Sequence, residues 1–191
     1  MYVRLYFLKK GKCCLKTRWI PEDDYNAIVS YLPPADRWLV RLLRATGYRI
    51  EDVLRTRRWM WSGTSVCICE AKTGNIRRIA ITDDIRRIVE QYEAVTPLKA
   101  NRLSAFVPGR RGRPGDRNKL HRTTLWRHFQ RAAKTAGLGG KGYSLHSLRK
   151  CYAVDRLRET GSIEEVQRDL GHRYISTTLI YLSDALILRN F

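Results

Sequence analysis

Apolar residues recur at helical spacing along most of this chain. Leu39, Leu42 and Leu43 share one face of a helical pattern, and Gly47 follows them where a helix would end. This pattern predicts a helix over residues 35–45. Helix-start and helix-end residues predict the further helices, which cover residues 21–32, a short segment from Tyr48, and residues 83–93, 123–137, 144–158, 162–171 and 176 onward.

One region alternates apolar and polar residues instead. The segments SVCICEA, residues 65–71, and IRRIAIT, residues 76–82, have the composition of strands, and Gly74 with Asn75 lies in the turn region between them. They predict a hairpin. The expected fold class is therefore α+β, mainly α-helical, with one small antiparallel β-sheet. Residues 2–8 are expected to form a further short strand or a segment that docks onto the body.

Net charge is the strongest compositional signal. Lys and Arg total 37 against 18 Asp and Glu, which gives a net charge of +19, and such an excess indicates a polyanionic partner, above all nucleic acid. A merely soluble basic protein is the plainer alternative, and membrane-surface binding would need an amphipathic basic helix or a lipid anchor, neither of which is clear. The residues expected to contact the nucleic acid lie mostly in a Gly/Pro/Arg loop and are Arg110, Arg111, Arg113, Arg117, Lys119, Arg122 and Lys141.

The cysteines and the apolar runs set further bounds. The five cysteines form no C-x-x-C pair and no zinc-like spacing, and their odd number argues against a disulfide framework. No stretch has the length of a membrane span, and the first residues lack the organisation of a signal peptide. These features favour a reduced, cytoplasmic compartment and give no sign of a metal site.

Several residues could carry chemistry, although each has an ordinary structural explanation. His146 and Arg149 are three apart on a predicted helix, so they share a face that could contact one phosphate or could simply be solvated. His172 directly follows the helix-ending Gly171 and could cap that helix. Taken alone, neither pattern identifies a function.

Further candidates flank these residues along the chain. Arg49 follows a glycine break and Lys72 lies in the hairpin turn, yet both could be ordinary surface cations in so basic a chain. Tyr174 and Tyr181 follow the last histidine, and either could be a nucleophile or a packing residue. Only the order and spacing of the whole set can distinguish these possibilities.

Together, the order and spacing of these residues resemble the tyrosine recombinase (phage integrase) family. The matching segments are TGYRIEDVLRTR, AKTGNIRRIAI, HSLRK, VQRDLGH and STTLIYL, and they extend from about residue 21 to the end of the chain. The resemblance implies a catalytic domain at 21–191, preceded by an N-terminal extension or linker remnant at 1–20. It also implies that the helical core-binding domain of typical members is missing, as in a small stand-alone recombinase or an excised fragment.

The resemblance implies a role for each residue of the set. Arg49 matches the first catalytic arginine, Asp52 the acid that follows it, Lys72 the hairpin lysine, His146 and Arg149 the H-x-x-R pair, His172 the second histidine and Tyr181 the nucleophile. Elementary chemistry supports these roles independently. The planar guanidinium group of an arginine stabilises the negative charge that develops on a phosphate. A tyrosine, with a reference pKa of about 10, needs a base to accept its proton. A lysine can donate a proton to the leaving 5′ oxygen. His146 is the expected base, His172 is expected to contact a phosphate oxygen, and Asp52 is expected to orient its neighbours His146 or Arg49.

The function implied is site-specific DNA recombination or integration through a covalent 3′-phosphotyrosyl intermediate, without a metal or another cofactor. Expected partners are double-stranded DNA and further copies of the chain in a tetramer on paired sites, with accessory DNA-bending or directionality proteins as further candidates. Residues 182–191 are apolar enough either to dock on a neighbouring copy or to close the domain's own core, and Tyr174 is expected to pack or to contact a backbone phosphate. A DNA-binding regulator that keeps the fold without the reaction, and a type IB topoisomerase-like enzyme, are the alternatives.

Overall fold

Residues 17–96, 105–107 and 120–187 are described by the computed structural model, and they form a mainly helical body with one two-stranded sheet. The elements, in chain order, are α1 (Glu22–Ser30), α2 (Pro34–Thr46), α3 (Ile50–Leu54), the 3-10 helix η1 (Arg58–Trp61), β1 (Ser65–Cys69), β2 (Ile76–Ala80), α4 (Asp83–Val95), α5 (Arg122–Thr135), α6 (Leu145–Thr160), α7 (Ile163–Leu170) and α8 (Ile175–Ile187). This arrangement confirms the expected fold class. The strand expected at residues 2–8 lies outside the described residues.

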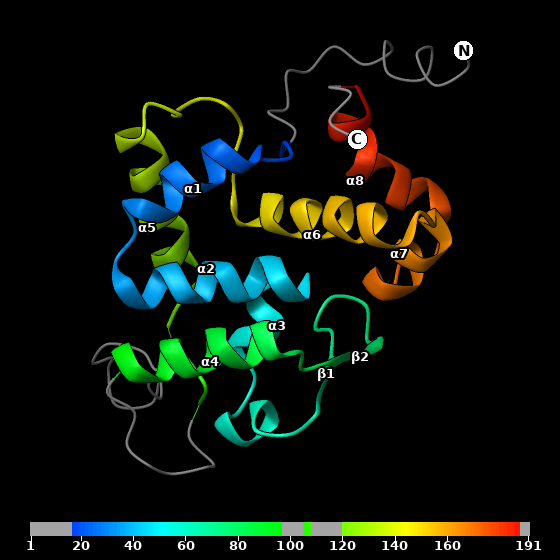
Figure 1. Ribbon diagram of the computed structural model, residues 1–191, viewed down its shortest axis with the longest axis horizontal. Coiled ribbons are helices and arrows are strands. Elements are labelled where there is room, and N and C mark those ends of the chain that lie inside the picture. The colour runs from blue at the N-terminus through cyan, green and yellow to red at the C-terminus, as the bar shows by residue number, and fades with distance from the viewer. Residues whose placement is uncertain (1–16, 97–104, 108–119, 188–191) are drawn as a thin grey trace.

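Helix α2 lies at the centre of the body, between α4 on one side and α6 on the other (Figure 1). Its side chains Leu39, Val40 and Leu43 are almost completely buried, because their helical spacing points them toward these neighbours. Helix α6 continues the packing toward α7 and α8, and its Leu148 and Val154 are fully buried. Helices α1 and α5 pack together at the opposite end of the body (Figure 1). Among the described helices, none is long and apolar enough to span a membrane.

Helix boundaries mostly follow the start and stop residues of the sequence. Ser144 and Ser162 accept hydrogen bonds from backbone N–H groups in the first turns of α6 and α7, so each caps a helix start as predicted. Several boundaries differ from the expectation by one or two residues, and two helix starts illustrate why. Pro34 is the first residue of α2, because a proline has no N–H to lose in a first helical turn. Helix α8 begins at Ile175, one residue before the expected Ser176.

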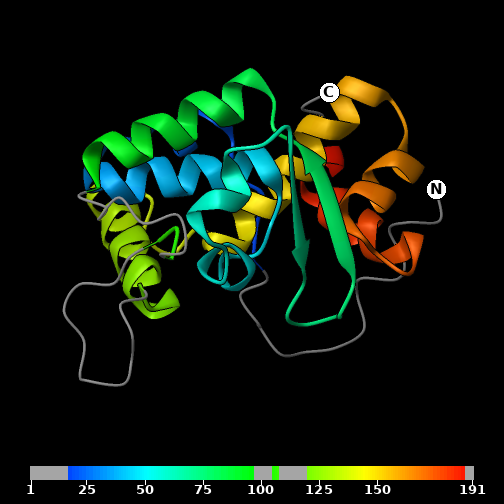
Figure 2. The ribbon, with the colours of Figure 1, turned by 90° about the horizontal axis from the view of Figure 1, so that it is seen from below.

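The predicted hairpin is confirmed, and its turn lies against the C-terminal helices. Strands β1 and β2 pair antiparallel, with Ser65 opposite Ala80 at the open end, and Figure 2 shows them side by side. Gly74 closes the turn with a φ of 72°, and its N–H donates to the carbonyl of Glu70. The side chain of Asn75 donates a hydrogen bond of 3.3 Å to the carbonyl of the glycine that ends α7. The turn is therefore held beside the segment that leads into α8.

The buried residues of α8 belong to the core of this chain. Leu182 and Ala185 are completely buried among the other core side chains. The C-terminal segment was expected either to dock on a neighbouring copy or to complete the core of its own domain. The burial of these two residues supports the second alternative. Residues 188–191 lie outside the described part of the chain.

Candidate active site

Separate segments of the chain bring the expected site residues together. Arg49 precedes α3, Lys72 lies in the turn between β1 and β2, His146 and Arg149 lie in the first turns of α6, His172 follows α7, and Tyr181 lies in the middle of α8. Helix α6 packs against both α7 and α8, and β2 packs against α7. Residues that are distant in the sequence therefore surround one site.

Tyr181 and His146 form the most direct contact of this site. The Tyr181 hydroxyl lies 2.7 Å from Nε2 of His146, which is hydrogen-bond distance, and Tyr181 is 9% exposed. Burial raises the pKa of Tyr181, although the nearby guanidinium groups of Arg149 and Arg49 oppose that rise. The phenol is therefore protonated at neutral pH and has a ring nitrogen beside it that can accept the proton.

The charge state of His146 suits a proton acceptor. Partial burial of the ring lowers the pKa of His146 to about 4, and four cationic side chains add to this effect. They are Arg149, Arg49, Lys150 and Lys72. A histidine with this pKa is neutral at pH 7. Of these four, Lys72 lies on the exposed hairpin turn and has the smallest effect.

His172 is the second histidine in contact with the ring of Tyr181. The ring centroids of His172 and Tyr181 are 4.7 Å apart, in an edge-on arrangement. Nδ1 of His172 lies 3.0 Å from the hydroxyl of the buried Thr178, which fixes the orientation of the ring. Its Nε2 is buried and has no hydrogen-bond partner among the described residues. Burial, with the nearby Arg149 and Arg49, lowers the pKa of His172 to about 4.

Arg149 is held rigidly from several directions. It is 1% exposed, and its Nη1 and Nη2 donate to the carbonyls of Gly47 at 2.7 Å and Leu170 at 2.6 Å. Nη1 also lies 3.1 Å from Oε1 of Glu70. The Nε of Arg149 is buried and has no hydrogen-bond partner within the described part of the chain. The guanidinium is therefore fixed in place, and the N–H of its Nε is available to a ligand.

Glu70 is the acid at the centre of the arginine pair, and the sequence reasoning missed it. Its Oε2 lies 2.7 Å from Nη1 of Arg49, and the residue is 1% exposed. Burial would raise the pKa of Glu70, but Arg149 and Arg49 outweigh burial, so the pKa lies below its usual value. The signal in the sequence is weak, because an acid at the end of a strand has no local pattern that relates it to distant arginines.

Asp52 has a different partner from the one expected. It is completely buried, and its Oδ1 accepts a hydrogen bond of 2.8 Å from the backbone N–H of Ala71. Asp52 was expected to contact His146 or Arg49, and this expectation is wrong. Its carboxylate contacts the hairpin beside Lys72 instead. A buried carboxylate requires a donor, and the hairpin backbone supplies one, whereas Arg49 already pairs with another acid. Asp52 thereby ties α3 to the base of the turn.

Tyr174 lies on the surface. It is 59% exposed, and the guanidinium of Arg173 lies 5.3 Å from the centroid of its ring. The expected packing role of Tyr174 is therefore wrong, while a contact with a backbone phosphate stays a prediction. Of the two candidate tyrosines, Tyr181 is the one that contacts a histidine of the site.

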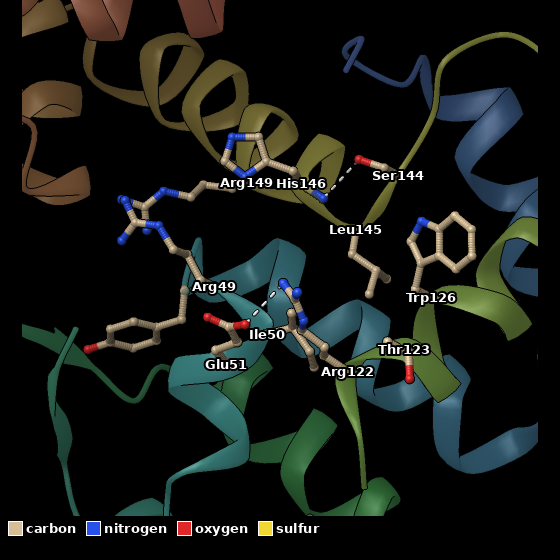
Figure 3. A pocket seen from close by; sticks show the side chains of 11 residues that line it. Arg49, Ile50, Glu51, Arg122, Thr123, Trp126, Ser144, Leu145, His146 and Arg149 are labelled. Atoms are coloured by element: carbon tan, nitrogen blue, oxygen red, sulfur yellow. Dashed lines mark hydrogen bonds and ion pairs between the residues drawn. The ribbon is translucent and has the colours of Figure 1, made fainter. Parts of the chain in front are cut away.

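A cavity of about 520 Å³ opens beside these residues (Figure 3). Arg49, His146 and Arg149 line one end of the cavity. Trp126 of α5 lies at the other end, and Leu145 points into the space between (Figure 3). Neither here nor elsewhere in the described residues do three His, Cys, Asp or Glu side chains form a group that could hold a metal ion.

The expected DNA-contact residues differ in their surroundings. Arg122 lines the cavity, and its Nη1 lies 3.1 Å from Oε1 of Glu51. Lys141 lies between α5 and α6, where its Nζ pairs with Asp24 at 2.9 Å. The others lie outside the described residues, and they are Arg110, Arg111, Arg113, Arg117 and Lys119. Their contact with DNA stays a prediction.

Comparison with known proteins identifies the family. A sequence model of the Phage integrase family matches residues 18–186, which is nearly the whole chain, so the chain belongs to this family. The tyrosine recombinase XerA of Pyrococcus horikoshii is 28% identical over 165 residues, which cover 85% of this chain and 55% of that protein. The chain thus spans about half the length of the curated relatives it matches.

Solved structures share the fold of this chain. A lambda integrase tetramer bound to a Holliday junction matches with a TM-score of 0.69 at 21% identity, over 88% of this chain and 48% of that one. The lambda integrase catalytic core matches with a TM-score of 0.65 at 21% identity, over 81% of this chain and 91% of that one. The fold of the described residues is therefore that of a known catalytic core.

Proposed function

We propose that this chain is a site-specific DNA recombinase that cuts and rejoins double-stranded DNA through a covalent 3′-phosphotyrosyl intermediate. The observation that carries the proposal is the 2.7 Å contact between Oη of Tyr181 and Nε2 of His146, beside the buried Arg149. A nucleophile, a base and a fixed guanidinium beside one cavity form the set that metal-independent phosphodiester cleavage requires. In this proposal, residues 21–191 form the catalytic unit.

The cleavage step exchanges the bond from the phosphate to a 5′ oxygen for a bond to the tyrosine, and the bond to the 3′ oxygen is kept. Oη of Tyr181 attacks the scissile phosphorus, and its proton moves to Nε2 of His146. The bond between phosphorus and the 5′ oxygen breaks as the bond between phosphorus and Oη forms. Lys72, on the exposed hairpin turn, donates a proton to the leaving 5′ oxygen. The products are a 3′-phosphotyrosine and a free 5′ hydroxyl.

Fixed positive charge stabilises the transition state. Nε of Arg149 and Nε2 of His172 are buried without a hydrogen-bond partner among the described residues, so both are suited to contact non-bridging phosphate oxygens. Arg49, whose side chain is 19% exposed, contributes the second guanidinium. Together these groups supply the charge stabilisation that a metal ion supplies in other phosphoryl-transfer sites. We therefore propose a reaction that uses no metal and no other cofactor.

Rejoining reverses these bonds with a different strand. The 5′ hydroxyl of a partner strand attacks the phosphotyrosine and gives its proton to Lys72, and Tyr181 leaves with the proton held by His146. Exchange between two duplexes involves four strands, so we propose a tetramer on paired sites, with accessory DNA-bending or directionality proteins as further partners. A lambda integrase tetramer on a Holliday junction shares the fold of this chain. The net charge of +19 favours association with DNA.

The test begins with selection of the DNA sequences that the purified protein binds, followed by mapping of the cleaved phosphate. A duplex with a nick next to that phosphate releases a short strand after cleavage, which prevents rejoining and traps the covalent product. We expect a protein–DNA adduct that survives denaturing electrophoresis and forms equally well in the presence of EDTA.

Other outcomes would favour other functions. No adduct on any selected sequence would support the DNA-binding regulator, and an adduct that requires Mg²⁺ would contradict the metal-free reaction. Relaxation of supercoiled plasmid by monomers without site preference would support the type IB topoisomerase-like enzyme. Each of these results contradicts the proposal in a different way.

A further inference from the structure

Glu70 lies where the guanidinium groups of the site meet. Its Oε2 lies 2.7 Å from Nη1 of Arg49, and its Oε1 lies 3.1 Å from Nη1 of Arg149. A third guanidinium, that of the buried Arg77, lies 3.7 Å from Oε1. One fully buried carboxylate therefore lies among three cations that would repel one another without it.

The hairpin fixes Glu70 in this place. The backbone N–H of Glu70 donates to the carbonyl of Asn75 at 2.8 Å, and its carbonyl accepts from the N–H of Gly74 at 2.9 Å. The hydroxyl of Thr73 donates a hydrogen bond of 2.9 Å to Oε2. Both the main chain and the carboxylate are therefore held by the turn, independently of DNA.

We propose that Glu70 is a positioning residue that holds Arg49 beside Arg149, so that both guanidinium groups contact the same scissile phosphate. This inference rests on the proposed function, because it concerns the groups that would bind that phosphate. The two arginines depend on Glu70 unequally. Arg149 is also anchored by the carbonyls of Gly47 and Leu170, whereas Arg49 pairs with no acid other than Glu70 among the described residues. Loss of the carboxylate therefore releases Arg49 first.

The carboxylate of Glu70 does not occupy the place of the phosphate. The Glu70 side chain has no exposed surface, while the side chain of Arg49 keeps 19% of its surface exposed beside the cavity. The acid holds Arg49 from the protein interior, and a phosphate approaches from the cavity. Glu70 thus acts as an internal anchor that remains in place when DNA binds.

Two substitutions distinguish the effect of the charge of Glu70 from the effect of its side-chain length. Glu70→Gln keeps the shape and removes the charge, and the single-turnover rate of adduct formation should fall about 100-fold, as when one transition-state donor is lost. Glu70→Asp keeps the charge on a shorter side chain, and its rate should remain about tenfold below that of the wild type. Glu93→Gln is the matched control, because Glu93 pairs with Arg58 at 2.7 Å away from the cavity, and its rate should be unchanged.

A second measurement responds to the arginine–phosphate contact itself. In chains that also carry Tyr181→Phe, affinity is measured for duplexes with either a phosphate or an uncharged methylphosphonate at the scissile position. With Glu70 present, the methylphosphonate should weaken binding about tenfold, and with Glu70→Gln less than about twofold. This ratio is insensitive to the fraction of unfolded protein, so a purely structural role of Glu70 would leave it unchanged.

Several results would overturn the proposal. One is a single-turnover rate of adduct formation for Glu70→Gln equal to that of the wild type. Another is a ratio of phosphate to methylphosphonate affinity that Glu70→Gln leaves unchanged. If Glu70→Gln does not fold, Glu70→Asp takes its place in both measurements. A wild-type rate of adduct formation together with an unchanged affinity ratio for Glu70→Asp would contradict the positioning role of Glu70. Rescue of Glu70→Gln by a sulfur in place of the leaving 5′ oxygen would also overturn it, because a thiolate leaves without a general acid and the defect would then belong to Lys72. If the wild type forms no adduct, the proposed function fails, while the affinity ratio still tests how Glu70 positions the arginines.

Discussion

The hydroxyl of Tyr181 lies 2.7 Å from Nε2 of His146, although 35 residues separate the two along the chain. Tyr181 lies in α8 and His146 in the first turn of α6, and the packing of these two helices creates the contact. The contact gives the proposed nucleophile an acceptor for its proton. Substitutions of Tyr181 and His146 therefore test the chemistry of the site most directly.

Replacement of His146 by glutamine should slow adduct formation. The amide fills a similar space but cannot take up the proton of the phenol, so we expect a loss of about 100-fold or more in the single-turnover rate. His128→Gln is the matched control, because His128 pairs with Asp36 away from the cavity and its rate should be unchanged. Equal rates for the two variants would contradict the role of His146 as the base.

The free energy of unfolding should decrease as pH falls from about 6.5 to about 4. Burial and nearby arginines hold the pKa of His146 and of His172 at about 4 in the folded chain, whereas an unfolded histidine has a pKa of about 6.5. The unfolded chain therefore binds more protons in this interval, and acid favours unfolding. Denaturant titrations across the interval should give a shallower decrease for His146→Gln than for the wild type, and identical slopes would contradict the lowered pKa of His146.

Substitution of Gly47 by alanine should affect both stability and catalysis. Gly47 has a φ of +62°, and a Cβ there would lie 2.5 Å from Cδ1 of Tyr152. We expect a loss of about 2–4 kcal/mol in the free energy of unfolding, from backbone strain and overpacking together. Because the carbonyl of Gly47 accepts a hydrogen bond from Arg149, the rate of cleavage should fall as well.

Gly140→Ala provides the control for this substitution. Gly140 also has a positive φ, of +84°, but a Cβ there would meet no atom within 4 Å. Its substitution should cost about 1 kcal/mol and leave the cleavage rate unchanged. Chemical denaturation of both variants checks the difference, and equal losses of stability would show that the contact with Tyr152 is unimportant.

Trp126 should contribute to DNA binding. It is 49% exposed and lines the end of the cavity away from His146 (Figure 3). An exposed indole can pack against the sugars of a duplex, and burial of part of its apolar surface is worth about 1–2 kcal/mol, so Trp126→Ala should weaken binding about tenfold. Trp59 is also 49% exposed but does not line the cavity, so Trp59→Ala should bind like the wild type. Equal affinities of the two variants, measured by fluorescence anisotropy with labelled DNA, would contradict this role.

Local sequence patterns were sufficient to predict most of the elements. The cap at Ser144, the glycine at Gly171 that ends α7 and the turn at Gly74 act on the backbone within a few residues, so their effect can be read directly from the sequence. The exact start of α8 was harder to predict, because several polar residues in a row can each begin a helix. The fold class followed from the helical spacing together with one hairpin.

Contacts between distant segments could not be predicted in the same way. The partner of Asp52 depends on how the hairpin docks beside α3, and the site of Glu70 depends on how the same hairpin meets α6. Neither arrangement leaves a periodic signal in the sequence. The resemblance to the family named Arg49, Arg149 and Tyr181, but it could not reveal which acid holds the arginines together.

The most direct test of the central claim compares Tyr181→Phe with Tyr174→Phe on the nicked duplex. Tyr181 contacts His146 inside the site, whereas Tyr174 is 59% exposed beside Arg173. We predict that Tyr181→Phe binds DNA but forms no covalent adduct, that Tyr174→Phe forms it at the wild-type rate, and that mass spectrometry locates the phosphate on Tyr181. An adduct with Tyr181→Phe, or its loss with Tyr174→Phe alone, would contradict the account.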